Sequence, residues 1–258
     1  MERSNKITDR APAFLKNRPD HLRAAFNFIL IFAGFFVFMT GCLSGDKMKA
    51  GLASLPDRSI PEEMLPWLEA GRQSEITPGI LAEARHITGA SRRERLFKAK
   101  QHLLACFTYD PHLNSIAFEK SAGDLFAGKV LGGCSDFALV EVTFYRAVGI
   151  PARLVLSANV DWMLQYPADP LVLPEGHCFV EVFLENRWYL VDPTFRWLFS
   201  VYDPESPHLP HGEYFFKRGK DFWDMGINDI RSFDQQLKSF CRRFQGDYTA
   251  PGYPKAPF

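Results

Sequence analysis

The sequence predicts an α+β fold, in which a series of helices precedes an antiparallel β-sheet. Helix-start signals recur in the first half of the chain, between residues 59 and 135. After Pro151 the apolar residues change from a helical period to strict alternation. Helices followed by antiparallel strands are typical of a layered α+β domain.

Composition places the chain among ordinary globular proteins. Its 258 residues are 47% hydrophobic, and 30 basic residues balance 30 acidic ones. This balance gives none of the positive excess that nucleic-acid binding requires, so we expect no nucleic-acid partner. No Gly-rich phosphate loop occurs in the sequence, and we expect no cofactor and no metal.

The N-terminal segment departs from this average. A basic opening is followed by residues 24–45, which carry no charge and are largely apolar. This run could be a buried core helix, a membrane anchor long enough to span ~30 Å of hydrocarbon, or an export signal. Its end, Met39-Thr-Gly-Cys42, resembles a bacterial lipobox. We therefore expect a signal peptide or anchor over residues 1–41, lipidation at Cys42, and a membrane-anchored domain in the bacterial cell envelope, outside the cytoplasm.

The rest of the chain divides into three segments. Residues 42–57 have the composition of a tether, residues 58–245 that of one folded domain, and residues 246–258 form a Pro-rich tail. Beyond Cys42 the chain has four cysteines, too few for a disulfide scaffold. A single bridge among Cys106, Cys178 and Cys241 is left open.

Four helix starts lie upstream of the strands. They are Ser59 with Glu62 before "MLPWLEAG", Thr77-Pro78 in a helix closed by Gly89, Ser91 with Glu94 in a helix reaching Phe107, and Ser121 in a short helix closed by Gly128. A fifth helix is expected from Ser135 to Val148, where Gly149 and Pro151 end it. Cys134 then lies at its first turn or N-cap, directly after two glycines.

Strands are expected over "ARLVLSANV" (residues 152–160) and in a hairpin over residues 177–195 whose turn is Glu185-Asn186. The segment 156–176 has the composition of a loop, and a last amphipathic helix is expected from Asp229 to Phe244. If Leu184 pairs with Arg187, then Phe179 faces Asp192 and His177 lies diagonally across from Asp192 on the same face of the sheet. A one-residue shift would place the two on opposite faces.

This geometry suggests a nucleophilic site. The positive end of a helix favours the thiolate of Cys134, an adjacent His177 favours it further, and Asp192 would fix the imidazole tautomer. Taken singly, a Cys, a His or an Asp is more often structural than catalytic. Cys178 points to the opposite face from His177 and reads as packing, and His208 and His211 in "HLPH" are too few ligands for a metal site.

Two stretches carry a family resemblance. "GGCSDFALVEVTFYRAVGIPAR" and "GHCFVEVFLENRWYLVDPT" resemble the transglutaminase-like superfamily, which shares its core with papain-type cysteine proteases. The resemblance implies a catalytic Cys at the start of a central helix that packs on an antiparallel sheet. It implies Cys134 as nucleophile, His177 as base and Asp192 as orienting acid, acting through an acyl-thioester on peptide or amide substrates. Residues 215–227 look like an extension seen in one branch of the superfamily.

The acceptor of the acyl group is left open by the residues. Water would give a peptidase or amidase, which superfamily tendency slightly favours, and an amine would give a cross-linking transglutaminase. A membrane-tethered binding module without catalysis is the alternative from another class. The intact Cys134, His177 and Asp192 argue against it.

Overall fold

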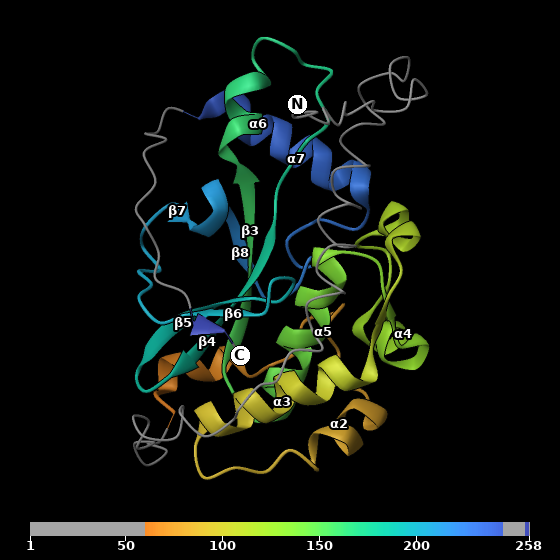
Figure 1. Ribbon diagram of the computed structural model, residues 1–258, viewed down its shortest axis with the longest axis vertical. Coiled ribbons are helices and arrows are strands. Elements are labelled where there is room, and N and C mark those ends of the chain that lie inside the picture. The colour runs from red at the N-terminus through yellow and green to blue at the C-terminus, as the bar shows by residue number, and fades with distance from the viewer. Residues whose placement is uncertain (1–59, 245–255, 258) are drawn as a thin grey trace, which may run out of the picture. The chain divides into compact units, whose positions relative to one another are not determined.

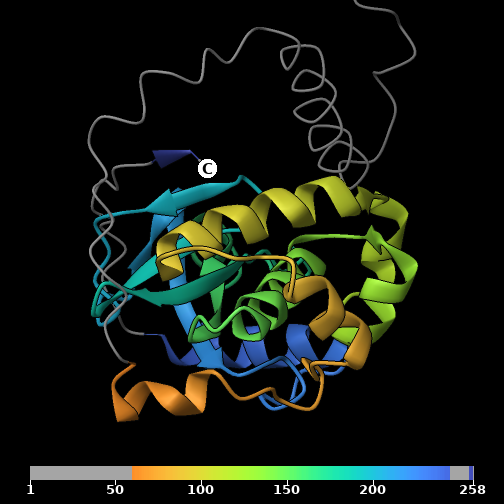
Figure 2. The ribbon, with the colours of Figure 1, turned by 90° about the horizontal axis from the view of Figure 1, so that it is seen from below.

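The computed structural model describes residues 60–244 and 256–257. Its centre is a seven-stranded antiparallel sheet in the order β7-β8-β3-β4-β5-β6-β9. Helix α5 (Cys134–Ala147) packs on β3 and β4, and α2, α3 and α4 pack around α5. Figures 1 and 2 show α5 between the sheet and these helices. The predicted α+β fold, with Cys134 opening the central helix, is confirmed.

The central strands of the sheet are long, and the strands at its edges are short. Their bounds are β3 (Ala152–Asn159), β4 (Cys178–Leu184), β5 (Arg187–Asp192), β6 (Trp197–Phe199), β7 (His208–Leu209), β8 (Glu213–Gly219) and β9 (Ala256–Pro257). A separate parallel pair, β1 (Thr108–Tyr109) with β2 (Val130–Leu131), holds the segment before α5. Among the described residues, no helix combines the length and hydropathy needed to cross a membrane.

The helices before α5 are η2 (Glu62–Trp67), α2 (Pro78–Ala84), α3 (Arg92–Cys106), η3 (Pro111–Ile116) and α4 (Ala122–Gly128). Helices α2, α3 and α4 begin where expected, η2 begins later than its predicted start, and η3 is not predicted. The segment "MLPWLEAG" holds only the 3₁₀ helix η2, because Pro66 inside it has no N–H to donate. Its predicted cap, Ser59, lies outside the described residues. Helix α2 ends at Ala84 and does not reach Gly89.

Side-chain caps fix the starts of three of these helices. Thr77, Ser91 and Ser121 accept hydrogen bonds from the backbone N–H groups of Ile80, Glu94 and Asp124, as the sequence predicts. At the end of α4 the left-handed residue is Lys129, with φ of 55°, and not Gly128. Gly149 does take the left-handed conformation that ends α5, with φ of 78°.

Helix α5 is buried on most of its surface, beyond the single stripe that its period predicts. Val140 and Phe144 of that stripe are buried, but so are Glu141 and Arg146. Glu141 forms an ion pair with the buried Lys100 of α3, and its other oxygen accepts from Tyr145 at 2.8 Å. Buried charges are stable only when paired in this way, so this pair locks α3 onto the central helix.

The hairpin has the register that the alternation predicts. Leu184 pairs with Arg187 and Val180 with Val191, so the opposed residue numbers sum to 371 throughout. Both turn residues, Glu185 and Asn186, have positive φ (52° and 63°), as a two-residue type I′ turn requires. This confirmed register is what places the end of β5 beside the start of β4.

Three parts of the sheet region differ from expectation. The segment expected as a loop (156–176) contains the end of β3 and helix α6 (Val160–Gln165), where Trp162 and Met163 are buried. Residues 213–219 form β8 along β3, so the unexplained 215–227 segment widens the sheet. Ala256 and Pro257, in the expected tail, pair as β9 with β6. Helix α7 (Ile230–Arg243) is as predicted, except that Ile230 is exposed.

Candidate active site

The glycines before Cys134 allow two segments to approach closely. A Cβ on Gly132 would lie 2.6 Å from the carbonyl carbon of Leu113, and one on Gly133 would lie 2.4 Å from Oδ1 of Asn114. Any side chain here would push η3 away from the start of α5.

The thiol of Cys134 faces two residues at the start of β4. It is in hydrogen-bonding contact with the side chains of His177 and Cys178 and with the backbone N–H of Cys178. The contact with the Cys178 thiol lowers the pKa of Cys134 most, burial opposes it, and His177 lowers this pKa further, to well below its usual range. Cys134 is therefore set up as a thiolate.

Cys178 does more than the packing that its position predicts. Its side chain lies in the core on the α5 side of the sheet. Burial, and then the adjacent Cys134, raise the pKa of Cys178 well above its usual range. Cys178 therefore keeps its proton and can donate an S–H hydrogen bond to the thiolate. All four cysteines among the described residues are free, so the single bridge left open by the sequence does not form there.

His177 links the thiol to a buried carboxylate. Its Nε2 atom lies 3.1 Å from both Oδ1 and Oδ2 of Asp192, which leaves Nδ1 as the ring nitrogen available to Cys134. The ring packs edge-on against Phe179, with 4.7 Å between centroids. The structure thus brings together the three residues that the sequence analysis selected.

The charges of this group stabilise one another. Burial alone would lower the pKa of His177, but contact with Asp192 and then with Cys134 raises it well above its usual range. Burial alone would raise the pKa of Asp192, but His177, and then His211, hold it well below its usual range. The arrangement favours the thiolate of Cys134, the imidazolium of His177 and the carboxylate of Asp192.

Hydrogen bonds to neighbouring strands hold the backbone of the site. The Ser157 hydroxyl of β3 accepts from the N–H of His177 at 3.0 Å. It also lies 2.6 Å from Oε2 of Glu213 in β8. After β5, the Nζ of Lys100 donates to the carbonyl of Pro193 at 3.1 Å. Both ends of the hairpin that carries His177 and Asp192 are thereby anchored to other elements.

Sequence reasoning missed three further groups at this site. His211 donates to Asp192, and Glu213 and Tyr109 both respond electrostatically to Cys134. Burial, and then Cys134, raise the pKa of Tyr109. In the sequence, the histidines of "HLPH" suggest only a weak metal site. Because β7 and β8 were not predicted, nothing in the sequence placed His211 beside the hairpin.

A second cluster could in principle hold a metal ion. Ligand atoms of Glu83, His102 and Cys106 all lie within 4.8 Å of one another. Nε2 of His102 already contacts Glu83 at 3.0 Å, and the other oxygen of Glu83 accepts from Lys129 at 2.7 Å. These groups satisfy one another through their own ion pairs, so the cluster is explained without a metal.

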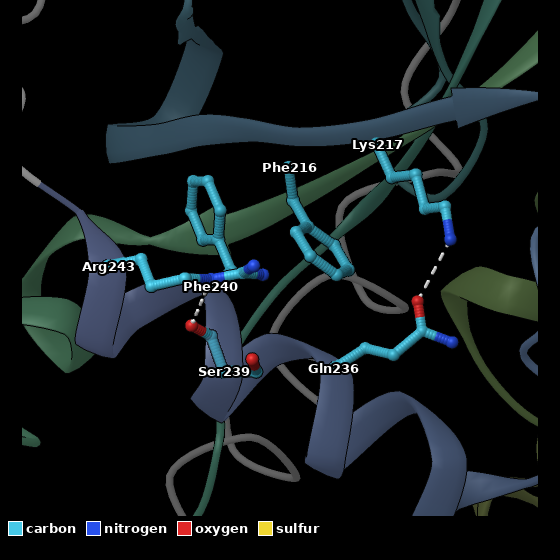
Figure 3. A pocket seen from close by; sticks show the side chains of 6 residues that line it. All are labelled: Phe216, Lys217, Gln236, Ser239, Phe240 and Arg243. Atoms are coloured by element: carbon cyan, nitrogen blue, oxygen red, sulfur yellow. Dashed lines mark hydrogen bonds between the residues drawn. The ribbon is translucent and has the colours of Figure 1, made fainter.

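A hollow of about 270 Å³ lies between β8 and α7 (Figure 3). Its polar groups are engaged: Lys217 donates to Gln236 at 3.0 Å and Arg243 to the carbonyl of Ser239 at 3.1 Å. Phe216 and Phe240 cover its floor with ring centroids 5.2 Å apart. None of its lining residues belongs to the Cys134 site.

A thiol at the start of a buried helix, facing a His–Asp pair on an antiparallel sheet, defines the class of thiol-dependent enzymes built on a papain-like core. Residues 82–193 match the sequence model of the transglutaminase-like superfamily. Over this stretch, which includes Cys134, His177 and Asp192, the chain is similar to that superfamily. No curated protein matches the sequence.

Two solved structures are similar to this chain at low identity. A candidate cysteine protease from Cytophaga hutchinsonii is 18% identical, with a TM-score of 0.47, over 65% of this chain and 50% of that protein. A protein described as a TGase is 13% identical, with a TM-score of 0.32, over 72% of this chain and 44% of that protein. The chain thus spans half or less of their length, and we base no functional conclusion on either.

Proposed function

We propose that the protein is a thiol acyl-transfer enzyme with Cys134 as nucleophile, His177 as general base and acid, and Asp192 as the group that orients His177. One observation carries this proposal: the thiol at the start of α5 contacts an imidazole whose other nitrogen is held by a buried carboxylate. This is the arrangement that activates a nucleophile in covalent catalysis.

The proposed reaction has two steps. The Cys134 thiolate attacks the carbonyl carbon of a peptide or amide, and the C–N bond breaks as the imidazolium of His177 gives its proton to the leaving amine. This leaves an acyl-thioester on Cys134. His177 then takes a proton from the acceptor, the acceptor attacks the thioester carbonyl, and the thiolate leaves. We expect the backbone N–H groups at the start of α5 to stabilise the oxyanion.

The acceptor decides between two activities. Hydrolysis by water is our preferred reaction, and transfer to an amine, as in a cross-linking transglutaminase, is the alternative. The test supplies a p-nitrophenyl ester as acyl donor, with and without a primary amine. Mass spectrometry then measures the acyl group on Cys134, the free acid and the amide.

We expect an acyl adduct on Cys134 and free acid as the main product even with amine present. Mainly amide would assign the transferase activity instead. No adduct on Cys134 with this or a peptide thioester donor would contradict the enzyme and favour a binding module without catalysis.

We further propose that the domain is tethered to a membrane of the bacterial cell envelope through a lipid on Cys42, where it acts on peptide or protein substrates outside the cytoplasm. Support comes from the uncharged run that ends in Met39-Thr-Gly-Cys42. A single acyl chain binds membranes only marginally, so firm anchoring requires the several chains of a processed lipoprotein.

Replacing Cys42 by Ser should therefore block processing and leave the precursor at full length. Intact-mass spectrometry of the membrane fraction should show the wild-type chain beginning at a lipidated Cys42. Cys106→Ser is the matched control and should be processed normally. A wild-type chain in the membrane that still begins at Met1 would favour an uncleaved anchor over residues 1–41.

A further inference from the structure

The buried carboxylate of Asp192 is shared by two imidazoles. Oδ1 and Oδ2 both lie 3.1 Å from Nε2 of His177, and Oδ2 also lies 3.2 Å from Nε2 of His211. Oδ1 further accepts the backbone N–H groups of Thr194 and Phe195 at 3.0 and 2.9 Å. All of these donors interact with the same negative charge of Asp192, which also stabilises His177.

The backbone is bent to bring His211 to this carboxylate. His211 has φ of 66° and ψ of 23°, between Pro210 and a Gly212 that also has positive φ. The left-handed region is uncommon for a residue other than glycine. Such conformations persist only where the surroundings hold them, and they concentrate at functional sites. The short segment η4 (Pro210–Gly212) that joins β7 to β8 therefore holds His211 in an uncommon conformation.

Aromatic rings fix the imidazole in place. Trp197 and Phe195 lie 5.0 and 5.1 Å from the His211 ring, centroid to centroid, and Phe199 and Phe179 lie 6.0 and 6.4 Å away. The ring therefore keeps its Nε2 toward Asp192. Its side chain is still 23% exposed, so it can exchange protons with solvent.

We propose that His211 is a positioning residue of the site, which sets the basicity of His177 through the shared carboxylate of Asp192. The proposal rests on the proposed function, because it assigns a role toward the catalytic base. Without the hydrogen bond from His211, the negative charge of Asp192 would interact more strongly with His177.

The sign of the effect follows from charge alone. An opposite charge stabilises the protonated imidazole and raises its pKa. Removing the His211 donor should therefore raise the pKa of His177 and extend the thiolate–imidazolium pair to higher pH. Other titratable groups interact with this site: Glu213 of β8 with His177 and Cys134, Glu141 of α5 with Asp192, and Tyr109, Asp136 and Cys178 with Cys134.

Two substitutions separate the hydrogen bond from packing. His211→Phe keeps a ring among the aromatic side chains but removes the donor. His211→Gln keeps an amide N–H near the position of Nε2 but cannot titrate between pH 4 and 10. His86→Gln, at an exposed histidine after α2, is the matched control. Thermal unfolding checks that each variant is folded.

The readout is the rate at which iodoacetamide alkylates Cys134 across pH, measured on the Cys134 peptide by mass spectrometry. It needs no substrate. We expect the upper apparent pKa of the Cys134–His177 pair to rise by about half a unit or more in His211→Phe. We expect His211→Gln and His86→Gln to match the wild type. An unchanged upper pKa in a folded His211→Phe would overturn the proposal.

A measurement on the wild type covers the case in which His211→Phe does not fold. In ¹⁵N-histidine-labelled protein, the Nε2–H resonance of His211 should move when the Cys134–His177 pair changes its protonation state, because both imidazoles share the Asp192 carboxylate. A His211 Nε2–H resonance that does not respond would overturn the proposal. If Cys134 of the wild type instead titrates as an ordinary thiol near ~8.5, it is the proposed function that fails.

Discussion

Replacing Cys134 by Ala should abolish acyl transfer while the domain stays folded. We expect turnover to fall on the order of 10⁴-fold or more, because no other group can form the acyl-enzyme. Cys134 is only half-buried and stands at the first position of α5, so losing its sulfur removes little packing. Steady-state kinetics with the p-nitrophenyl ester, together with thermal unfolding, measure both effects.

Cys106→Ala is the matched control, since Cys106 is also a half-buried free thiol of a helix. It should keep wild-type turnover. A Cys134→Ala variant that retains turnover would remove the thiol from the mechanism altogether.

The pH dependence of Cys134 alkylation gives a second measure of the same nucleophile. The pKa of Cys134 lies well below its usual range, and the pKa of His177 lies well above its own. The thiolate–imidazolium pair therefore forms as pH rises through the lowered pKa of Cys134 and is lost as pH rises through the raised pKa of His177. Alkylation should stay fast well below the ordinary thiol pKa of ~8.5.

The part of the site that could be predicted from the sequence is the part fixed by local geometry. The period of residues 135–148, with Gly149 and Pro151 behind them, locates α5 and therefore puts Cys134 at its start. The Glu185-Asn186 turn fixes the register of the hairpin, and the register places His177 and Asp192 on one face. Both strands of the hairpin are joined by this turn, so their register follows from neighbouring residues alone.

The parts that could not be predicted depend on contacts between distant segments. Strand β8 pairs with β3 across more than fifty residues of sequence, and no turn connects the two directly. His211 reaches Asp192 only through that pairing. The contact between Cys178 and Cys134 was missed for a different reason. Alternation predicts correctly that Cys178 lies on the opposite face of the strand from His177, but at the start of β4 that face meets the start of α5.

Replacing Asp192 by Asn should cost on the order of 10³–10⁴-fold in kcat, the range seen when a triad carboxylate is neutralised. Asn has nearly the same shape, and its oxygen can still accept from the N–H groups of Thr194 and Phe195. Its amide nitrogen, however, would face Nε2 of His177 or His211, donor against donor. His177 then loses both its fixed tautomer and the charge that raises its pKa.

The same substitution should change how stability depends on pH. The folded pKa of Asp192 is depressed, so its contribution to stability is present above its unfolded pKa of ~3.9 and is lost as pH falls through the folded value. The folded pKa of His177 is raised, so its contribution is present below ~6.5 and is lost as pH rises through the folded value. Asp192→Asn removes the first contribution and most of the second, and the midpoint of thermal unfolding should fall most between about pH 4 and 6.5, where both are present. Asp161→Asn, at an exposed carboxylate of α6, is the control. A variant with wild-type kcat and an unchanged pH profile of unfolding would show that Asp192 neither orients His177 nor stabilises its protonated form.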